Sequence, residues 1–221
     1  MNLTLHLKLL SDTTFGRGDG VSGLVDQEIE HDSITGLPFV RGRTLKGLLV
    51  EECANILYAL REAPGEDNLK EAAQQLFGSG GSSLRDGGVL HVGNAELLPS
   101  LKEAAQHDIN AKRLQPSDVL DVFTTIRRQT AMDEETGAPD DHSLRSSRVL
   151  LRETELTAQI DIALPDDDHA ALALLCACAA GLRRGGTGRN RGRGRLEAWL
   201  EEVNMDEYLL RFEQLAGDGP R

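Results

Sequence analysis

Residues 181–195 read GLRRGGTGRNRGRGR, a stretch with six arginines and no acidic residue. Glycine adopts positive φ without strain and lets a ligand approach the backbone closely. Arginine is planar, permanently charged and able to bind phosphate through two parallel hydrogen bonds. The stretch has no Gly-Lys-Ser/Thr ending, and it follows a predicted helix rather than a strand, unlike a P-loop or a dinucleotide-binding loop. It therefore predicts a loop that holds a polyanionic backbone without reading its bases.

The sequence on either side of this loop predicts regular structure. The apolar composition of residues 169–182 predicts a helix. Apolar and polar residues alternate at the start of residues 196–203, which predicts a strand. A disordered Arg-Gly segment is the alternative that composition alone permits. A loop between two core elements is usually folded. We therefore interpret residues 181–195 as a folded loop.

Three further strands are predicted from alternating apolar and polar residues, over 2–9, 88–97 and 156–164. A helix is predicted from Thr44, as its N-cap, to about Leu60, with apolar residues at helical spacing. With insertions removed, the order is strand, helix, strand, strand, helix, strand. This order predicts the α+β fold class, with a ferredoxin-like or RRM-like βαββαβ core.

Two insertions interrupt this core. A long first loop, residues 11–36, contains six acidic residues, and a loop of this length is usually functional. Residues 99–151 show little core periodicity and predict a protruding, thumb-like hairpin. We expect a single domain over 1–221, with the core in 1–98 and 152–204 and an acidic terminal helix over 205–216.

The charge of the chain is distributed unevenly. Lysine and arginine total 24 against 36 acidic residues, giving a formal net charge of −12. Acidic residues concentrate near the end of the chain, and basic residues gather at 41–46, 112–113, 127–128, 145–152 and 183–195. A GC-rich genome could explain the number of arginines but not this segregation. Because local potential decides where a polyanion binds, a nucleic-acid interface is compatible with the negative net charge.

The three cysteines, Cys53, Cys176 and Cys178, are odd in number and lie in apolar surroundings, which favours reduced, buried thiols. A Cys-x-Cys pair without a histidine at ligand spacing is weak support for zinc. The sequence shows no signal-peptide pattern and no long apolar run. We expect a cytoplasmic protein without a membrane partner.

Four stretches occur along the chain in the following order: an aspartate loop with the following helix start (23–26 and 32–47), an LFG turn with its strand (76–78 and 89–97), a thumb-like hairpin (124–151) and a glycine-rich loop (185–195). Together they resemble the RAMP superfamily, and specifically the repeated backbone subunit of type III CRISPR interference complexes. Two changes mark a less common branch: Arg43-Thr44 stands where the family has two serines, and Asn94 stands where it has aspartate.

The resemblance implies a subunit that binds a CRISPR RNA guide and a complementary target RNA. Its other partners would be neighbouring copies or paralogues in a helical filament, and further type III subunits. It implies that Asp26 is both the catalytic residue and the metal ligand of an endoribonuclease that cuts the target at regular intervals. Mg²⁺ or Mn²⁺ would bind weakly and only with RNA present, since magnesium needs only one or two protein carboxylates. The residues expected to contact RNA are Arg41, Arg43, Lys46, Arg127, Arg128, Arg145, Arg148, Gly186, Gly188, Arg189, Arg191 and Arg193.

Each of these assignments has an alternative. Asp26 could be one solvated acid among several, Asp32 more simply turns the chain, and a lone loop histidine such as His31 is usually a surface residue. The chain could also be an inactive scaffold or a capping paralogue of the same complex. A third possibility is an endonuclease that processes the CRISPR RNA precursor. That class usually relies on histidine, sometimes with tyrosine, and His31, Tyr58 and Tyr208 form no recognisable pattern of this kind.

Overall fold

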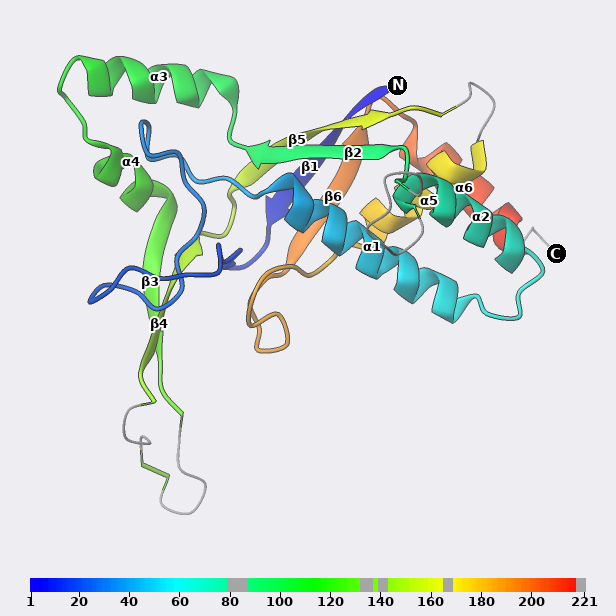
Figure 1. Cartoon of the computed structure of the whole chain (residues 1–221), viewed down its shortest axis with the longest axis horizontal. Coiled ribbons are helices and arrows are strands. Elements are labelled where there is room, and N and C mark those ends of the chain that lie inside the picture. The colour runs from blue at the N-terminus through cyan, green and yellow to red at the C-terminus, as the bar shows by residue number, and fades with distance from the viewer. Residues whose placement is uncertain (79–86, 132–136, 139–142, 165–168, 218–221) are drawn as a thin grey trace.

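The computed structural model describes residues 1–78, 87–131, 137–138, 143–164 and 169–217. A four-stranded antiparallel sheet forms its core (Figure 1). The strands β1 (Asn2–Leu9), β2 (Leu90–Glu96), β5 (Glu155–Ile162) and β6 (Leu196–Glu201) lie in the spatial order β2-β5-β1-β6. This is the strand order of a ferredoxin-like βαββαβ unit, so the predicted α+β fold class is confirmed.

Alternation along β1 determines which face of the sheet is buried. Leu5 lies opposite Ala158 on β5 and Leu200 on β6, and all three side chains are buried. Since side chains alternate between the two faces of a strand, every second residue of β1 joins the same apolar layer. The other face of the sheet carries polar and charged residues.

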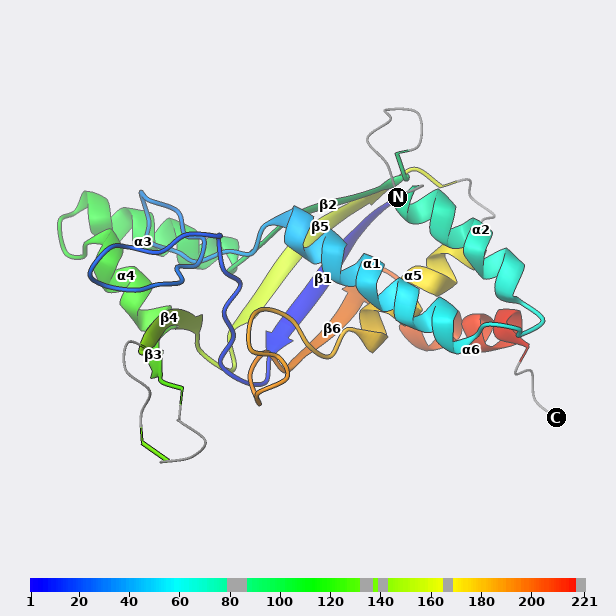
Figure 2. The same cartoon turned by 60° about the horizontal axis from the view of Figure 1, so that its bottom comes forward.

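Four helices pack together at one end of the molecule, α1 (Gly42–Ala59), α2 (Glu66–Phe77), α5 (His169–Gly181) and α6 (Met205–Ala216) (Figure 2). Residues 171–179 of α5 are all buried, because α1, α2, α6 and β6 surround this helix. A helix that is apolar on every side is stable only in such a position. None of the described helices combines the length and the apolar character needed to cross a membrane.

The start of α1 differs from the prediction. The helix begins at Gly42 with Arg41 at the N-cap position, so Thr44 is not the N-cap. The Oδ1 atom of Asn94 on β2 instead accepts a hydrogen bond from the Gly42 N–H at 3.0 Å. A Cβ atom on Gly42 would lie 2.1 Å from the carbonyl oxygen of Val92, so only glycine allows this close approach. A contact from a distant strand therefore replaces the local cap that the sequence suggested.

The predicted thumb-like segment contains two helices as well as a hairpin. Helices α3 (Pro99–Asn110) and α4 (Pro116–Phe123) precede β3 (Thr124–Gln129) and β4 (Arg145–Leu150), which pair antiparallel and project from the body (Figure 1). The prediction missed these helices because α3 is largely polar and buries only Ala105, and because α4 has only 8 residues. Prolines at their first helical positions and a Gln115–Asp118 capping box were the available signals. Parts of the predicted hairpin, 132–136 and 139–142, lie outside the described residues.

Candidate nucleic-acid interface

The first loop lies along the base of the β3–β4 hairpin. Gln27 and Ser147 form a parallel bridge, and the Arg148 N–H donates to the Gln27 carbonyl at 2.9 Å. Further back in the loop, Thr13 and Leu150 exchange backbone hydrogen bonds at 3.0 and 2.8 Å. The loop is therefore fixed to the hairpin by backbone pairing at two points.

Asp26 is held on β4 by Ser146. The Asp26 N–H donates to the carbonyl and hydroxyl oxygens of Ser146, at 3.0 and 3.1 Å. In return, the N–H and hydroxyl of Ser146 donate to Asp26 Oδ2, at 2.6 and 3.0 Å. The hydrogen bond from the Ser146 N–H, then that from its hydroxyl, lowers the pKa of the Asp26 carboxyl, and the nearby Arg145 charge adds to this. Asp26 is thus an ionised, exposed carboxylate at neutral pH.

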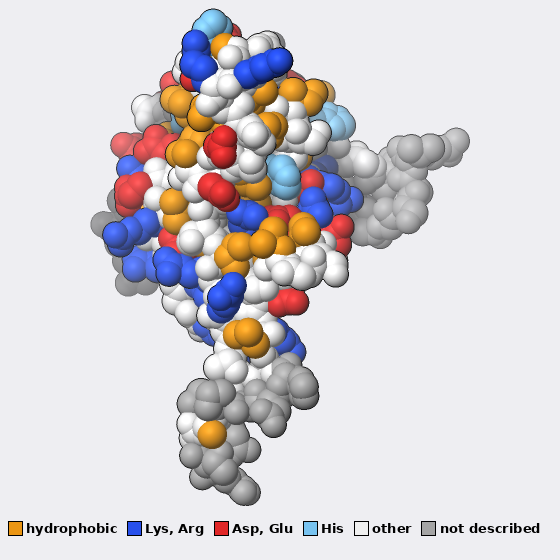
Figure 3. All heavy atoms as spheres, turned by 90° about the vertical axis from the view of Figure 1, so that its left-hand side faces the viewer, with side chains coloured by type: hydrophobic (Ala, Val, Ile, Leu, Met, Phe, Trp, Pro, Cys, Tyr) orange, Lys and Arg blue, Asp and Glu red, His pale blue; other side chains and the backbone are white. Residues whose placement is uncertain are grey.

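A hollow of about 630 Å³ lies beside Asp26, between the first loop and the hairpin. Arg128 lines it from β3, and Leu24 and Leu144 line it with 51% and 65% of their surface exposed. Figure 3 shows this end of the molecule, where Lys and Arg, hydrophobic, and Asp and Glu side chains are mixed on the surface above the hairpin. A carboxylate, a guanidinium and apolar side chains around one hollow can accommodate the phosphate, ribose and base of a nucleotide.

The glycine-rich loop docks against the first loop and is folded, as predicted. The Thr187 N–H donates to the Thr14 carbonyl at 2.9 Å, and its hydroxyl lies 3.4 Å from Gln27 Oε1. Gly186 has φ +77°, and a Cβ atom there would lie 2.5 Å from the Thr14 carbonyl oxygen. Three stretches that the sequence singled out separately, the first loop, the hairpin and the glycine-rich loop, therefore meet next to Asp26.

Arg148 has a different position from the one predicted for an RNA-binding residue. It is 6% exposed and forms an ion pair with Glu28, Nε to Oε1 at 2.9 Å. Its Nη1 donates to the Thr124 hydroxyl at 3.1 Å. A guanidinium that is buried and paired in this way is not available to a phosphate, so the structure corrects this assignment to a structural role.

Several other predicted RNA-binding residues have partners within the chain. Arg189 Nη1 and Nη2 lie 2.8 and 2.6 Å from the two Glu51 carboxylate oxygens on α1. Lys46 Nζ donates to the Leu90 carbonyl at 2.8 Å. Two more predicted residues form ion pairs with acids of the first loop, Arg41 with Glu30 and Arg127 with Asp12. These cations are partly exposed. A phosphate would compete with the carboxylate partner of each arginine, whereas Lys46 uses only one of its three N–H donors for the Leu90 carbonyl.

The remaining predicted cations have no ion-pair partner in the part of the chain that the structure describes: Arg43, Arg128, Arg145, Arg191 and Arg193. Gly188, with φ +74°, precedes Arg191 and Arg193 in the glycine-rich loop. Unpaired guanidiniums are the groups best placed to bind phosphate, since no internal carboxylate must be displaced. They lie on three separate segments, and the structure brings Arg128 and Arg145 closest to Asp26.

Sequence reasoning missed Arg183, Arg184 and Ser146. The two arginines line a hollow of about 320 Å³ between α1 and the glycine-rich loop, together with Arg189. Their membership of the same arginine-rich stretch could have included them. Ser146 had no such signal, because nothing in the local sequence pairs it with Asp26, 120 residues away.

The described residues contain no group of three or more His, Cys, Asp or Glu side chains that could hold a metal ion. Asp32 is used in a turn, since its Oδ1 accepts from the N–H groups of Ile34 and Thr35 at 2.7 and 3.2 Å. Asp26 Oδ1 makes no hydrogen bond within the described residues, and Asp26 is one of the residues that line the hollow. Magnesium commonly binds one or two carboxylates together with substrate phosphates. The donor set fits a metal shared with RNA, not one held by the protein alone.

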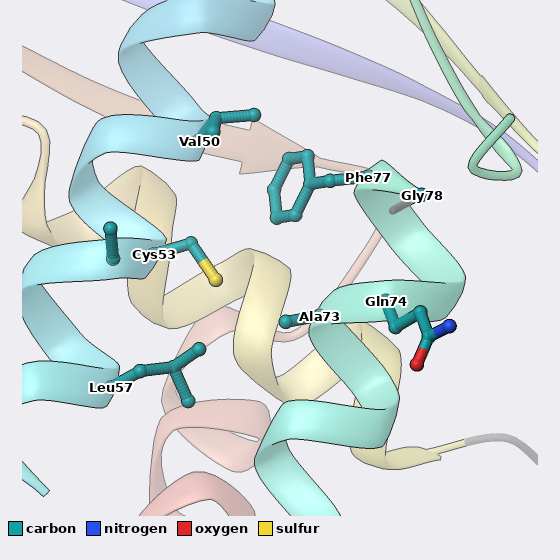
Figure 4. Close-up of a pocket in the computed structure, with 8 residues that line it drawn as sticks. Val50, Cys53, Leu57, Ala73, Gln74, Phe77 and Gly78 are labelled. Carbon is teal, nitrogen blue, oxygen red and sulfur yellow. The ribbon is translucent and has the colours of Figure 1, made fainter. Parts of the chain in front are cut away.

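A third hollow, of about 390 Å³, lies between α1 and α2 (Figure 4). Figure 1 shows that these helices lie away from the hairpin. Val50, Cys53 and Leu57 line it from α1, with Ala73 and Phe77 opposite on α2. Its lining carries no Asp, Glu, His, Lys or Arg side chain that could contact a phosphate.

Comparison with known proteins agrees with this architecture. A family model of the RAMP superfamily matches residues 6–197. A chain in the cryo-EM structure of Type III-B Cmr-beta bound to cognate target RNA is similar, with a TM-score of 0.64, 11% sequence identity and coverage of 95% of this chain and 99% of that chain. A chain of Type III-B Cmr-beta in the apo state has a TM-score of 0.64, 12% identity and coverage of 91% and 98%. At this identity the likeness shows a shared fold. No curated protein matches the sequence.

The family model covers most of the chain, including the first loop, the hairpin and the glycine-rich loop. The chain therefore belongs to the RAMP superfamily.

Proposed function

We propose that this chain is a backbone subunit of a type III CRISPR ribonucleoprotein. It binds the guide RNA along its sugar-phosphate backbone and cleaves the complementary target RNA at regular intervals through Asp26. The observation that carries this proposal is the position of the Asp26 carboxylate, ionised and exposed beside Arg128 in the hollow at the base of the hairpin. Structures similar in fold come from Type III-B Cmr-beta, in one case bound to cognate target RNA, which supports the same partners here.

RNA binding falls to loops rather than to the open face of the sheet. Glu155, Asp161, Glu197 and Glu201 are exposed on β5 and β6, where they repel a polyanion. RRM domains, in contrast, stack bases on several aromatic residues of this face. Here the face carries Trp199, whose ring is already stacked on His6 with centroids 5.0 Å apart. The unpaired arginines lie at the start of α1, on the hairpin and in the glycine-rich loop, and positive-φ glycines occur in the first loop and the glycine-rich loop. A loop-based interface holds backbone without selecting sequence, as a guide-binding subunit requires.

The hollow beside Asp26 suits a target nucleotide displaced from the duplex. Its base can pack on Leu24 and Leu144, and Arg128 can bind the adjacent phosphate. Displacement would bring the 2′-hydroxyl of that nucleotide in line with the adjacent phosphate. The 2′-oxygen would then bond to phosphorus as the bond to the 5′-oxygen of the next nucleotide breaks, which leaves a 2′,3′-cyclic phosphate and a 5′-hydroxyl that carries the proton lost by the 2′-hydroxyl. A bound Mg²⁺ or Mn²⁺ would neutralise charge that develops on the phosphate. Asp26 Oδ1 is the group of this chain that would hold it, while Oδ2 remains bound to Ser146.

The test compares the assembled complex with wild-type chain, Asp26→Asn and Asp19→Asn, using end-labelled complementary RNA and Mg²⁺. Asp19 is a matched control, an exposed acid of the same loop that pairs with Arg17 and does not line the hollow. We expect regularly spaced products with wild type and Asp19→Asn, and none with Asp26→Asn, while target binding is unchanged. Cutting by Asp26→Asn at the wild-type rate would leave this chain the role of a scaffold.

Precursor processing receives no support from the positions of the histidine and tyrosines. His31 Nδ1 lies 3.3 Å from the Ile29 carbonyl, in the first loop. Tyr58 packs against Arg61 at the end of α1, and Tyr208 on α6 lies beside His169. These side chains each have a different neighbour and do not assemble into one site. Sensitivity of cleavage to EDTA separates the two activities, because processing of that kind needs no metal.

A further inference from the structure

We infer that Ser146 is a positioning residue for Asp26, and that through it the hairpin sets the orientation of the carboxylate. The inference rests on the proposed function of Asp26. It goes further because it makes the contact between the hairpin and the first loop a condition for cleavage.

The hydrogen bonds between Asp26 and Ser146 run in both directions. The Ser146 hydroxyl accepts from the Asp26 N–H at 3.1 Å and donates to Asp26 Oδ2 at 3.0 Å. The two backbone N–H groups add bonds of 3.0 and 2.6 Å. A single exposed loop carboxylate would otherwise sample several rotamers. With Oδ2 held twice, the free Oδ1 has one preferred direction, and it can meet a metal or a 2′-hydroxyl without further ordering.

The partner of Ser146 across the hairpin is Arg128, directly opposite on β3. Both residues line the hollow beside Asp26, so their side chains share one face of the hairpin. The hairpin therefore carries the hydroxyl that orients the carboxylate and the guanidinium placed for the phosphate as one rigid pair. A slip of one residue along β4 would turn Ser146 to the other face and release Asp26.

Ser147 provides a matched control in the next position of β4. Its hydroxyl donates to Gln27 Oε1 at 3.3 Å, so it also joins the hairpin to the first loop. It makes no hydrogen bond to Asp26 in the described structure. Removing the Ser147 hydroxyl therefore costs the same junction one hydrogen bond and removing the Ser146 hydroxyl costs it two, but only the Ser146 hydroxyl touches the carboxylate.

The experiment places Ser146→Ala, Ser146→Thr and Ser147→Ala in the assembled complex. One readout is the single-turnover cleavage rate as a function of Mg²⁺ concentration. The other does not need cleavage: Mn²⁺ affinity measured by electron paramagnetic resonance, with a target RNA that carries 2′-deoxynucleotides at the cleavage positions. We expect Ser146→Ala to lower the rate and the Mn²⁺ affinity by about tenfold, the scale of an outer-shell loss at a metal site. Target affinity is unchanged, Ser146→Thr restores both values, and Ser147→Ala behaves as wild type.

Two results overturn the inference: wild-type rate and Mn²⁺ affinity in Ser146→Ala, or an equal loss in Ser147→Ala, which would indicate a general weakening of the junction. Asp26→Asn run in parallel separates this failure from that of the proposed function. If Asp26→Asn stops cleavage while Ser146→Ala does not alter it, Asp26 keeps its role and Ser146 loses its own. If Asp26→Asn cuts as wild type does, both proposals fail.

Discussion

Arg148 and Glu28 form a buried ion pair, with Arg148 Nε 2.9 and 3.2 Å from the two carboxylate oxygens. Their side chains are only 8% and 2% exposed. Asp121 and Thr124 accept further hydrogen bonds from Arg148, at 3.3 and 3.1 Å. The pair joins the first loop to β4, two residues along each segment from Asp26 and Ser146. The segments that carry Asp26 and Ser146 are therefore joined by an ion pair that is almost completely buried.

Replacement of Arg148 by alanine should destabilise the fold strongly. Glu28 would be left as a buried charge without its partner, and such a loss lowers the free energy of unfolding by about 3–5 kcal/mol. Urea denaturation of the isolated chain measures this. Arg145→Ala on the same strand is the control, since Arg145 is exposed and has no ion-pair partner among the described residues; its effect should stay within about 0.5 kcal/mol. Equal midpoints for the two variants would contradict the structural role of Arg148.

Gly186 and Gly192 separate backbone strain from close packing in the glycine-rich loop. Both have positive φ, +77° and +79°, so alanine at either position adds about 1–2 kcal/mol of strain. Only at Gly186 would the new Cβ atom also meet the Thr14 carbonyl oxygen, at 2.5 Å, whereas nothing lies within 4 Å at Gly192. We expect Gly186→Ala to lower Tm and guide-RNA affinity more than Gly192→Ala does. Equal effects in thermal unfolding and filter binding would show that this docking is unimportant.

Glu51 should act as an internal competitor of RNA for Arg189. The bidentate pair lowers the pKa of the Glu51 carboxyl, through hydrogen bonds and the charge of Arg189, so Glu51 is ionised at neutral pH. Glu51→Gln frees the guanidinium, and we expect tighter RNA binding with a salt-dependence slope steeper by up to about one. Glu52→Gln is the control, since Glu52 lines the same hollow and the substitution changes the net charge equally, without a bond to Arg189. A similar gain in both variants would indicate a general charge effect.

The acid limb of the pH–rate profile for target cleavage should lie at a lower pH than the usual pKa of an aspartate carboxyl group. Hydrogen bonds from Ser146 stabilise ionised Asp26, so its folded-state pKa is lowered. The stability that they contribute is present above the unfolded-state pKa and is lost as pH falls through the folded-state pKa. Ser146→Ala removes the hydroxyl donor, so the limb should move to higher pH, while Ser147→Ala leaves it in place. Single-turnover rates across the acid range measure this, and an unmoved limb would show that another group controls it.

The Cys176 thiol should resist alkylation in the folded protein. Burial raises its pKa to about 12, so almost none is thiolate at mildly alkaline pH. Iodoacetamide labelling followed by peptide mass spectrometry should show Cys176 unmodified in native protein. Concentrated guanidinium chloride should expose all three free cysteines to reaction. Rapid native labelling of Cys176 would contradict the packing of α5.

The sequence was informative where structure follows a short-range pattern. Alternating leucines predicted β1, the uniformly apolar run predicted the buried α5, and the strand and helix order predicted the ferredoxin-like core. It failed where a distant residue replaces a local signal. Thr44 has the chemistry of an N-cap, yet Asn94 on β2 receives the first N–H of α1. Helix α3 was missed because it is largely polar, and α4 because it has only 8 residues, although Pro99 and Pro116 marked their starts.

The sequence by itself determined the core, because the alternation and apolar runs that form it are local. It also identified three segments with residues suited to RNA binding: the first loop, the hairpin and the glycine-rich loop. Only the tertiary structure decided what those residues do. Arg145 and Arg148 are the same residue type, three positions apart on one strand. Arg145 is exposed to solvent, whereas Arg148 is buried against Glu28. Asp26 is one acid among six in its loop until β4 places Ser146 beside it, 120 residues later. Contacts at that separation depend on how whole elements pack, and no local pattern of residues encodes them.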